Sequence, residues 1–214
     1  LESIAGQVAA GCNLIFFVTG NGSITNFPIV PTIKIVTTTQ RHAMLSKEMD
    51  VNAGAFLDGT PMEELGRQTL DLSVAVASGQ RTFGEAAGHA QVQIWRNWQQ
   101  NDATQLNELQ NARLPTGQPI PLRADNPVPG VKIEALGTAA ARDRIGLILP
   151  ASLCSSQIAR LAAETLNTKG FGREQGISHF VALVHTEGCG VSAGYAEELQ
   201  LRTLVGYLIH PLVR

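Results

Sequence analysis

The stretch "RIGLILPASLCSSQIARLAAETLNTKG" (residues 144–170), followed by "HFVALVHT" (residues 179–186), decides the fold. An apolar run of strand length leads into a helical pattern that starts at serine and ends at Gly170, and a second apolar run follows. Another helical pattern, "AGYAEELQLRTLVGYLIH" (residues 193–210), comes next. The order strand, helix, strand, helix predicts parallel strands joined by right-handed crossovers. We therefore predict an α/β fold with mostly parallel sheets flanked by helices, and a Rossmann-like second half.

The first half of the chain alternates in the same way, but less regularly. Short apolar and β-branched runs predict strands, and apolar residues at helical spacing predict helices. The expected elements are a helix at 1–11, strands at 13–20 and 32–39, a helical turn or two at 41–49, a loop at 50–54, a helix at 61–79 and a short helix at 85–98.

A change of composition divides the two halves. Residues 99–130 are polar and rich in proline, with one short helical patch, which is typical of a linker or a surface crossing. We therefore expect residues 1–98 and residues 131–214 to form separate domains on either side of this linker. We expect residues 131–214 to form a Rossmann-like α/β domain that is incomplete at its C-terminus.

The composition excludes several classes of protein. Of 214 residues, 44% are hydrophobic and 16% are charged, and the net charge is -2, so a folded core is expected and a basic nucleic-acid surface is not. The longest apolar runs have strand length, so no membrane partner is expected. Three widely spaced cysteines and the lack of an export leader favour the reducing cytoplasm. We also expect the chain to be a piece of a longer protein.

The motif "HTEGCG" (residues 185–190) ends the second apolar run. Ligands of parallel α/β sheets bind at the carboxyl ends of the strands, where "PASLCSS" (residues 150–156) also falls, so the two segments are expected to be neighbours. The imidazole of His185 and the thiolate of Cys189 are good ligands for iron or zinc. The alternative is a strand-to-helix turn with a buried cysteine and a hydrogen-bonded histidine.

Other residues carry weaker signals of a site. Cys154 falls at a helix start, where the helix dipole favours a thiolate, although a buried cysteine with ordinary capping is the simpler explanation. The turn "TGNGS" (residues 19–23) could bind an anion through its backbone N–H groups, or be a plain tight turn. Asp50 and Asn52 could bind a cation or sugar hydroxyls, or form an Asx turn. Lys34 could pair with an anion, act as a base or point to water from a sheet edge.

Taken together, these motifs resemble a known family. The segments "AAGCNLIFFVTGNGS" (9–23), "VPTIKIVTTT" (30–39) and "EMDVNAG" (48–54) are similar to the end of the catalytic domain of the altronate and galactarate dehydratases. The segments "ILPASLCSSQIA" (148–159) and "FVALVHTEGCG" (180–190) resemble the domain that precedes it in that family. The combination is far more specific than any single motif. The resemblance implies that residues 1–98 form the C-terminal part of a dehydratase-type catalytic domain.

The resemblance implies a hydro-lyase that removes water from a sugar acid to give a 2-keto-3-deoxy acid. It also implies a divalent metal, Fe²⁺ or alternatively Mn²⁺, and a small-molecule sugar acid as partner. The catalytic residues that it implies are His185, Cys189 and Lys34, and the metal ligands are His185, Cys189 and Asp50. The implied substrate-binding residues are Gly20, Gly22, Ser23, Asn52, Cys154, Ser155 and Gln157.

The sequence departs from the family pattern in its order. In the family the "HTEGCG" domain precedes the "TGxGS" segment, whereas here it follows, and Asn21 stands where arginine is usual. Because the central part of the catalytic domain is absent, we expect this chain alone to be inactive. Two kinds of protein contact are expected for this chain: with a second copy of itself in a homo-oligomer, or with further parts of a longer chain.

Two other functions remain as alternatives. One is a non-catalytic α/β module that binds a carboxylate or packs against a catalytic subunit. The other is a hydrolase that uses Cys154 or Cys189 as nucleophile with His185. A thiol–imidazole hydrogen bond and an oxyanion hole would distinguish the hydrolase.

Overall fold

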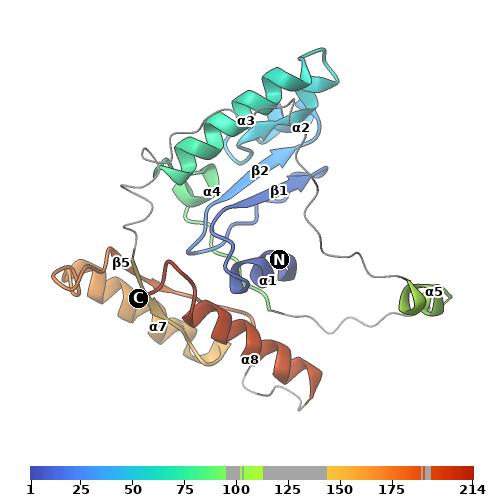
Figure 1. Cartoon of the computed structure of the whole chain (residues 1–214). Coiled ribbons are helices and arrows are strands. Elements are labelled where there is room, and N and C mark those ends of the chain that lie inside the picture. The colour runs from blue at the N-terminus through green and yellow to red at the C-terminus, as the bar shows by residue number, and fades with distance from the viewer. Residues whose placement is uncertain (95–101, 103, 113–143, 189, 191–193) are drawn as a thin grey trace, which may run out of the picture.

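The computed structural model describes residues 1–94, 102, 104–112, 144–188, 190 and 194–214. These residues form small parallel sheets flanked by helices, which confirms the predicted α/β class. The first half contains one sheet of three strands, and the second half contains a sheet of two strands. Figure 1 shows helix α1 between the first sheet and helices α7 and α8 of the second half.

The first sheet has the order β1–β2–β3, and all of its pairs are parallel. Strand β1 (Ile15–Thr19) pairs with β2 (Thr32–Val36) from Ile15 opposite Thr32 to Thr19 opposite Val36. Strand β3 (Val51–Asn52) lies where a loop was expected, and this expectation was wrong. The Asp50 N–H donates to the Lys34 carbonyl at 2.9 Å, so the strand forms because β2 supplies backbone partners that the local sequence does not reveal.

The second sheet confirms the predicted crossover. Strands β4 (Ile145–Ile148) and β5 (His179–Ala182) are parallel, and helix α7 (Ser156–Thr168) connects them. The end of the chain lies alongside β4, where the Ile145 N–H donates to the Leu212 carbonyl at 2.7 Å. Helix α8 (Tyr195–Leu208) follows β5, as the helical pattern predicted.

The remaining helices include one clear difference from expectation. Helix α4 (Phe83–Ala86) ends early, so the short helix expected over residues 85–98 was wrong for its described part. Gly88 takes a left-handed φ of 70°, and the Gln91 N–H then donates to the Asn26 carbonyl at 3.1 Å, which draws the backbone away from a helical path. The other helical segments are α1 (Glu2–Ala9), α2 (Thr39–Met44), η1 (Ala53–Phe56), α3 (Met62–Ala77), α5 (Leu106–Asn111) and η3 (Leu153–Ser155).

One hydrophobic core joins the two halves of the chain. Ile4 and Val8 of α1, Ile15 of β1, Ile145 of β4 and Tyr207 of α8 all belong to it. Each fully buried side chain of this kind contributes roughly 1.5–3 kcal/mol relative to exposure. The two halves therefore stabilise each other and pack as one body.

Tyr207 is the largest side chain in this shared core and has no exposed surface. Its hydroxyl donates to the Ala5 carbonyl at 3.1 Å, and its ring lies 5.5 Å from that of Phe27. Burial, and then the negative charge of Glu187, raise the pKa of this phenol. Tyr207 therefore links α8 to the first half by both packing and hydrogen bonding.

Among the described residues, no helix combines the length and the apolar character that crossing a membrane would require.

Candidate functional site

The loop after β4 and the "HTEGCG" turn after β5 lie side by side, as predicted from their places at the carboxyl ends of the strands. The Leu153 N–H donates to the Glu187 carbonyl at 2.7 Å. The His185 ring contacts the Pro150 carbonyl, with Nε2 at 2.9 Å from the oxygen. These two bonds hold the neighbouring loops together at one edge of the second sheet.

The hydrogen bonds of His185 fix its tautomer. The Glu187 N–H donates to Nδ1 at 3.2 Å, so Nδ1 carries no proton, and Nε2–H donates to the Pro150 carbonyl. The side chain is only 1% exposed. Both ring nitrogens are therefore engaged, and a metal could bind the ring only if it displaced one of these bonds.

Glu187 is a buried residue of the motif that was not among the predicted site residues. Its Oε1 accepts from the Ile94 N–H at 2.9 Å and from the Thr186 hydroxyl at 3.2 Å. Ile94 belongs to the first half of the chain. The carboxylate thus anchors the "HTEGCG" turn to the other half, a contact that no local sequence pattern could indicate.

The predicted residues at the start of α7 lie beside this turn. Cys154 and Gln157 are exposed, and Cys154 forms no disulfide with any described residue. The Ser155 hydroxyl donates to the Ser152 carbonyl at 2.9 Å and belongs to a capping box with Ser152. Cys189 lies outside the described residues, so its place relative to Cys154 stays a prediction.

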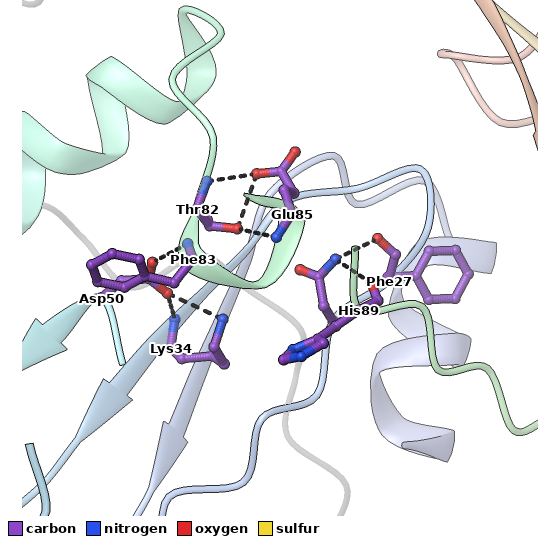
Figure 2. A network of polar contacts seen from close by, with 8 residues as sticks. Phe27, Lys34, Asp50, Thr82, Phe83, Glu85 and His89 are labelled. Carbon is purple, nitrogen blue, oxygen red and sulfur yellow. Dashed lines mark hydrogen bonds and ion pairs between the residues drawn. The ribbon is translucent and has the colours of Figure 1, made fainter. Parts of the chain in front are cut away.

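Lys34 and Asp50 form an ion pair inside the first half (Figure 2). The Lys34 Nζ lies 3.4 Å from Asp50 Oδ2, and the two side chains are 0% and 5% exposed. Asp50 Oδ2 also accepts from the Lys34 N–H at 2.8 Å, and Oδ1 accepts from the Phe83 N–H at 2.8 Å. Three alternatives were predicted for Lys34, and the structure agrees with one of them, in which its ammonium pairs with an anion. That anion is the carboxylate of Asp50.

Helix α4 covers this ion pair through Gly84. A Cβ atom on Gly84 would lie 2.8 Å from the Lys34 Nζ and 3.0 Å from the Asn26 Oδ1, so the close approach requires glycine. Asn26 holds the end of the same segment, because its Nδ2 donates to the His89 carbonyl at 2.9 Å. Direct contact between Lys34 and a substrate would therefore require the segment at 83–89 to move.

The "TGNGS" turn follows β1 and closes on Thr19. The N–H groups of Gly22 and Ser23 donate to the Thr19 hydroxyl oxygen at 3.1 and 3.2 Å. Gly22 has a φ of 85°, which favours glycine. The Thr19 side chain, which sequence reasoning did not select, thus accepts the N–H groups that could have bound an anion. Substrate binding by Gly20, Gly22 and Ser23 stays a prediction.

Asn52 lies at the end of β3, at the same edge of the sheet. Its Nδ2 donates to the Thr39 hydroxyl oxygen at 3.0 Å, and that hydroxyl donates to Asp58 Oδ2. The strand register sets Thr19, Val36 and Asn52 side by side. Gly20, Gly22, Ser23 and Asn52 therefore share the carboxyl edge of the β1–β2–β3 sheet.

Of the predicted metal ligands, His185 and Asp50 lie in the described part of the chain and Cys189 lies outside it. Within it, no group of three or more His, Cys, Asp or Glu side chains is placed to hold a metal ion. His185 uses both ring nitrogens, and both carboxylate oxygens of Asp50 accept backbone N–H groups. The described donors therefore do not fit a metal site as they stand, and the metal stays a prediction.

Comparison with known proteins identifies two related domains in this chain. Residues 1–100 match the family model described as "D-galactarate/Altronate dehydratase, C-terminal". Residues 134–213 match the model described as "D-galactarate dehydratase/Altronate hydrolase, second domain". The chain thus carries the second domain after the C-terminal one.

Curated relatives match over shorter regions. The beta subunit of (2R)-sulfolactate sulfo-lyase from Chromohalobacter salexigens is 30% identical over 96 residues, which cover 44% of this chain and 25% of that protein. Altronate dehydratase from Escherichia coli is 31% identical over 88 residues, or 41% of this chain and 18% of the relative.

Altronate dehydratase from Bacillus subtilis is also 31% identical, over 90 residues, which cover 42% of this chain and 18% of the relative. The matched regions thus span a quarter or less of these curated relatives. No solved structure matches the chain. The two domain matches cover most of the sequence, and the chain belongs to the galactarate/altronate dehydratase family.

Proposed function

We propose that this chain forms part of a hydro-lyase that removes water from a sugar acid of the altronate or galactarate type. The observation that carries the proposal is the presence of two domains of one dehydratase family in a single chain. The names of the relatives support the same class, because altronate and sulfolactate are both 2-hydroxy carboxylates and both names describe an elimination.

The proposed reaction is an elimination across C2 and C3 of the sugar acid. A base removes the C2 proton, the electron pair of that bond forms a C2=C3 double bond, and the C3–O bond breaks. The departing hydroxide takes a proton and leaves as water. The enol loses its hydroxyl proton and gains a proton at C3, which gives the 2-keto-3-deoxy acid.

In this scheme, side chains of the protein stabilise the negative charge that develops next to the carboxylate of the substrate. His185, Lys34 and Cys189 are the proposed catalytic residues. His185 has a ring nitrogen without a proton, Nδ1, which would become a base if the Glu187 N–H released it. Lys34 would supply positive charge once the segment at 83–89 moved off it.

A divalent metal, Fe²⁺ or Mn²⁺, belongs to the proposal as an expectation from the family. Cys189 and chain segments outside the described residues would have to complete the donor set. Elemental analysis of the anaerobically purified intact protein tests this directly. One equivalent of iron or manganese would support the metal, and a metal-free protein with full activity would contradict it.

The activity itself is tested with the intact natural polypeptide that contains this sequence. We expect it to form a 2-keto-3-deoxy acid from altronate or galactarate, and we expect His185→Ala to lower kcat by roughly a hundredfold or more. His179→Ala, at an exposed position on β5, is the matched control and should retain activity. Absence of keto acid from every sugar acid tried would reject the hydro-lyase.

A second candidate function is a carboxylate-binding or packing module without catalysis. Both ring nitrogens of His185 are bonded to backbone groups, and its neighbour Glu187 anchors the other half of the chain. These contacts suit a structural role. Binding of sugar acids by the intact protein, with no turnover under any metal condition, would favour this alternative.

A further inference from the structure

Helix α4 belongs to a short flap, defined here as residues 80–87, which lies between two glycines. Gly79 follows α3 and has a φ of 106°, and Gly88 follows α4 and has a φ of 70°. No atom of the described chain beyond the adjoining residues lies within 4 Å of the position that a Cβ would take at either glycine. Because glycine changes its backbone dihedral angles at little cost, the two ends of the flap suit hinges.

The flap has no apolar anchor in the core. Its only buried residues are Thr82 and Gly84, neither of which carries a large apolar side chain. Phe83, its one large apolar residue, is 41% exposed. A segment with so little buried apolar surface opens locally at a lower free energy than the core.

One hydrogen bond to a buried charge holds the flap against the sheet (Figure 2). The Phe83 N–H donates to Asp50 Oδ1 at 2.8 Å. The other bonds drawn at the start of α4 join Thr82 to Glu85 and so lie within the flap itself. In the described chain, the Phe83 N–H is therefore the latch of the flap, the group that ties it to the rest of the molecule.

The chain beyond Gly88 is fixed separately. The Asn26 Nδ2 donates to the His89 carbonyl at 2.9 Å, and the Gln91 N–H donates to the Asn26 carbonyl at 3.1 Å. These bonds hold the base of the second hinge and leave the flap free to turn on it.

The closed flap leaves buried polar groups without partners. The Lys34 Nζ forms no hydrogen bond within the described chain, and its ion-pair contact with Asp50 is 3.4 Å long. The Asn26 Oδ1 is unpartnered as well, and both atoms face Gly84, at 2.8 and 3.0 Å from the Cβ position. Opening would bring both groups into water, where an ammonium and an amide oxygen are better solvated. The closed state therefore carries a cost that opening removes.

We propose that residues 80–87 open and close over the Lys34–Asp50 ion pair, with the Phe83 N–H as the latch. The carboxylate of Asp50 couples the two events, because it accepts the latch and neutralises Lys34 at the same time. Opening frees one oxygen of Asp50 and exposes the ammonium. The proposal supplies the movement that a catalytic Lys34 needs, but it stands without that role, since the flap opens in the protein alone.

Proline at position 83 removes the latch and preserves the start of α4. Phe83 is the first residue of the helix, a position that needs no N–H and tolerates proline. Thr82 has φ -67° and ψ 163°, the extended conformation that a residue before proline adopts. Phe83→Ala removes the same ring but keeps the N–H, so it is the matched control.

Acetylation of lysines in the intact protein, followed by peptide mass spectrometry, measures the opening. We expect Phe83→Pro to raise the acetylation rate of Lys34 by roughly ten- to a hundredfold, the range for a hydrogen bond to a charged group. Phe83→Ala should stay within about threefold of the wild type. The exposed Lys47 reports the reagent and should react at the same rate in all three proteins.

Urea separates opening of the flap from unfolding of the whole molecule. A local opening exposes little surface, so low concentrations of urea should hardly change the rate at Lys34, whereas global unfolding would raise it steeply. Gly84→Ala opens the flap by a second route, because its Cβ would press on Lys34 and Asn26 in the closed state. This variant should also speed the reaction of Lys34.

Two results would overturn the proposal. Equal rates at Lys34 in Phe83→Pro and Phe83→Ala would refute the latch. If Lys34 reacted only with the steep urea dependence of global unfolding, in the wild type and in Gly84→Ala, the flap itself would be refuted, whether or not Phe83→Pro folds. Neither result bears on the proposed hydro-lyase, which is tested by product formation.

Discussion

Lys34 shows how the position of a strand decides the state of a charged side chain. Lys34 can pair with Asp50 because Asp50 directly precedes β3, and β3 lies beside β2 on the side opposite β1. This arrangement makes β2 the central strand. Helix α4 covers the side chain through Gly84, so the lysine is buried and needs an anion. The attraction between the two charges offsets part of the cost of removing them from water, whereas the loss of one partner leaves an uncompensated buried charge.

We predict that Asp50→Asn will lower the free energy of unfolding by about 3–5 kcal/mol, because it leaves the Lys34 ammonium buried without its anion. Adding Lys34→Met should restore most of this loss, since the asparagine can still accept the Phe83 N–H. Urea denaturation measures both. Asp71→Asn, at an exposed position of α3, should change stability by less than about 0.5 kcal/mol. Equal losses in the single and the double variant would contradict this explanation.

Among the elements, helices α1 and α8 pack against each other across the two halves. A Cβ atom on Gly206 would lie 2.3 Å from the Ala9 carbonyl oxygen, so only glycine permits the observed approach. The contact joins elements that are almost two hundred residues apart in the sequence. It therefore depends on the fold of the whole chain and not on local propensity.

Replacing two helical glycines by alanine tests this contact. Gly206→Ala should destabilise the protein by about 1–3 kcal/mol, because α1 and α8 must separate. Gly66→Ala in α3 has no atom within 4 Å of the new Cβ and should stabilise by up to about 1 kcal/mol through helix propensity. Thermal unfolding distinguishes the opposite signs. If both variants shifted the midpoint in the same direction, the packing of α1 against α8 would be refuted.

The sequence predicted those elements whose signals are local. Apolar runs gave β1, β2, β4 and β5, and capping residues with helical spacing gave α3, α7 and α8. Strand β3 has only two residues and forms through pairing with β2, so its sequence contains no alternation of apolar and polar residues that would predict it. In the candidate site, the neighbourhood of "PASLCSS" and "HTEGCG" followed from topology. The hydrogen bonds of Thr19 and the anchoring of Glu187 by Ile94 could not be predicted from the sequence, because they depend on where the backbone turns in three dimensions.

At the scale of the whole molecule, two family domains occur in an unusual order and still share one core. The second domain follows the C-terminal one in the chain, and Tyr207 of the former packs on Phe27 and Ala5 of the latter. The contact between the domains therefore does not require that the second domain precede the C-terminal domain in the sequence. We expect the same faces to meet wherever the two domains occur together.

The buried phenol of Tyr207 makes this interface sensitive to alkali. Its pKa is raised in the folded state, so the unfolded chain loses the proton first, near the usual value of about 10. Stability is therefore full below that pH and falls as the pH rises above it. Tyr207→Phe removes this dependence, so its free energy of unfolding should fall less steeply above pH 10. Parallel pH profiles for the two proteins would contradict the prediction.

The most direct test of the account is a proton NMR spectrum of the products that the intact protein forms from galactarate and altronate in ²H₂O. We predict a 2-keto-3-deoxy acid with one solvent deuterium at C3, because the enol takes its new proton from water after the C3–O bond breaks. Galactitol should not react, since it lacks the carboxylate that makes the C2 proton acidic. Unchanged sugar acids, under iron or manganese and without added metal, would contradict the proposal that this family member is a sugar-acid hydro-lyase.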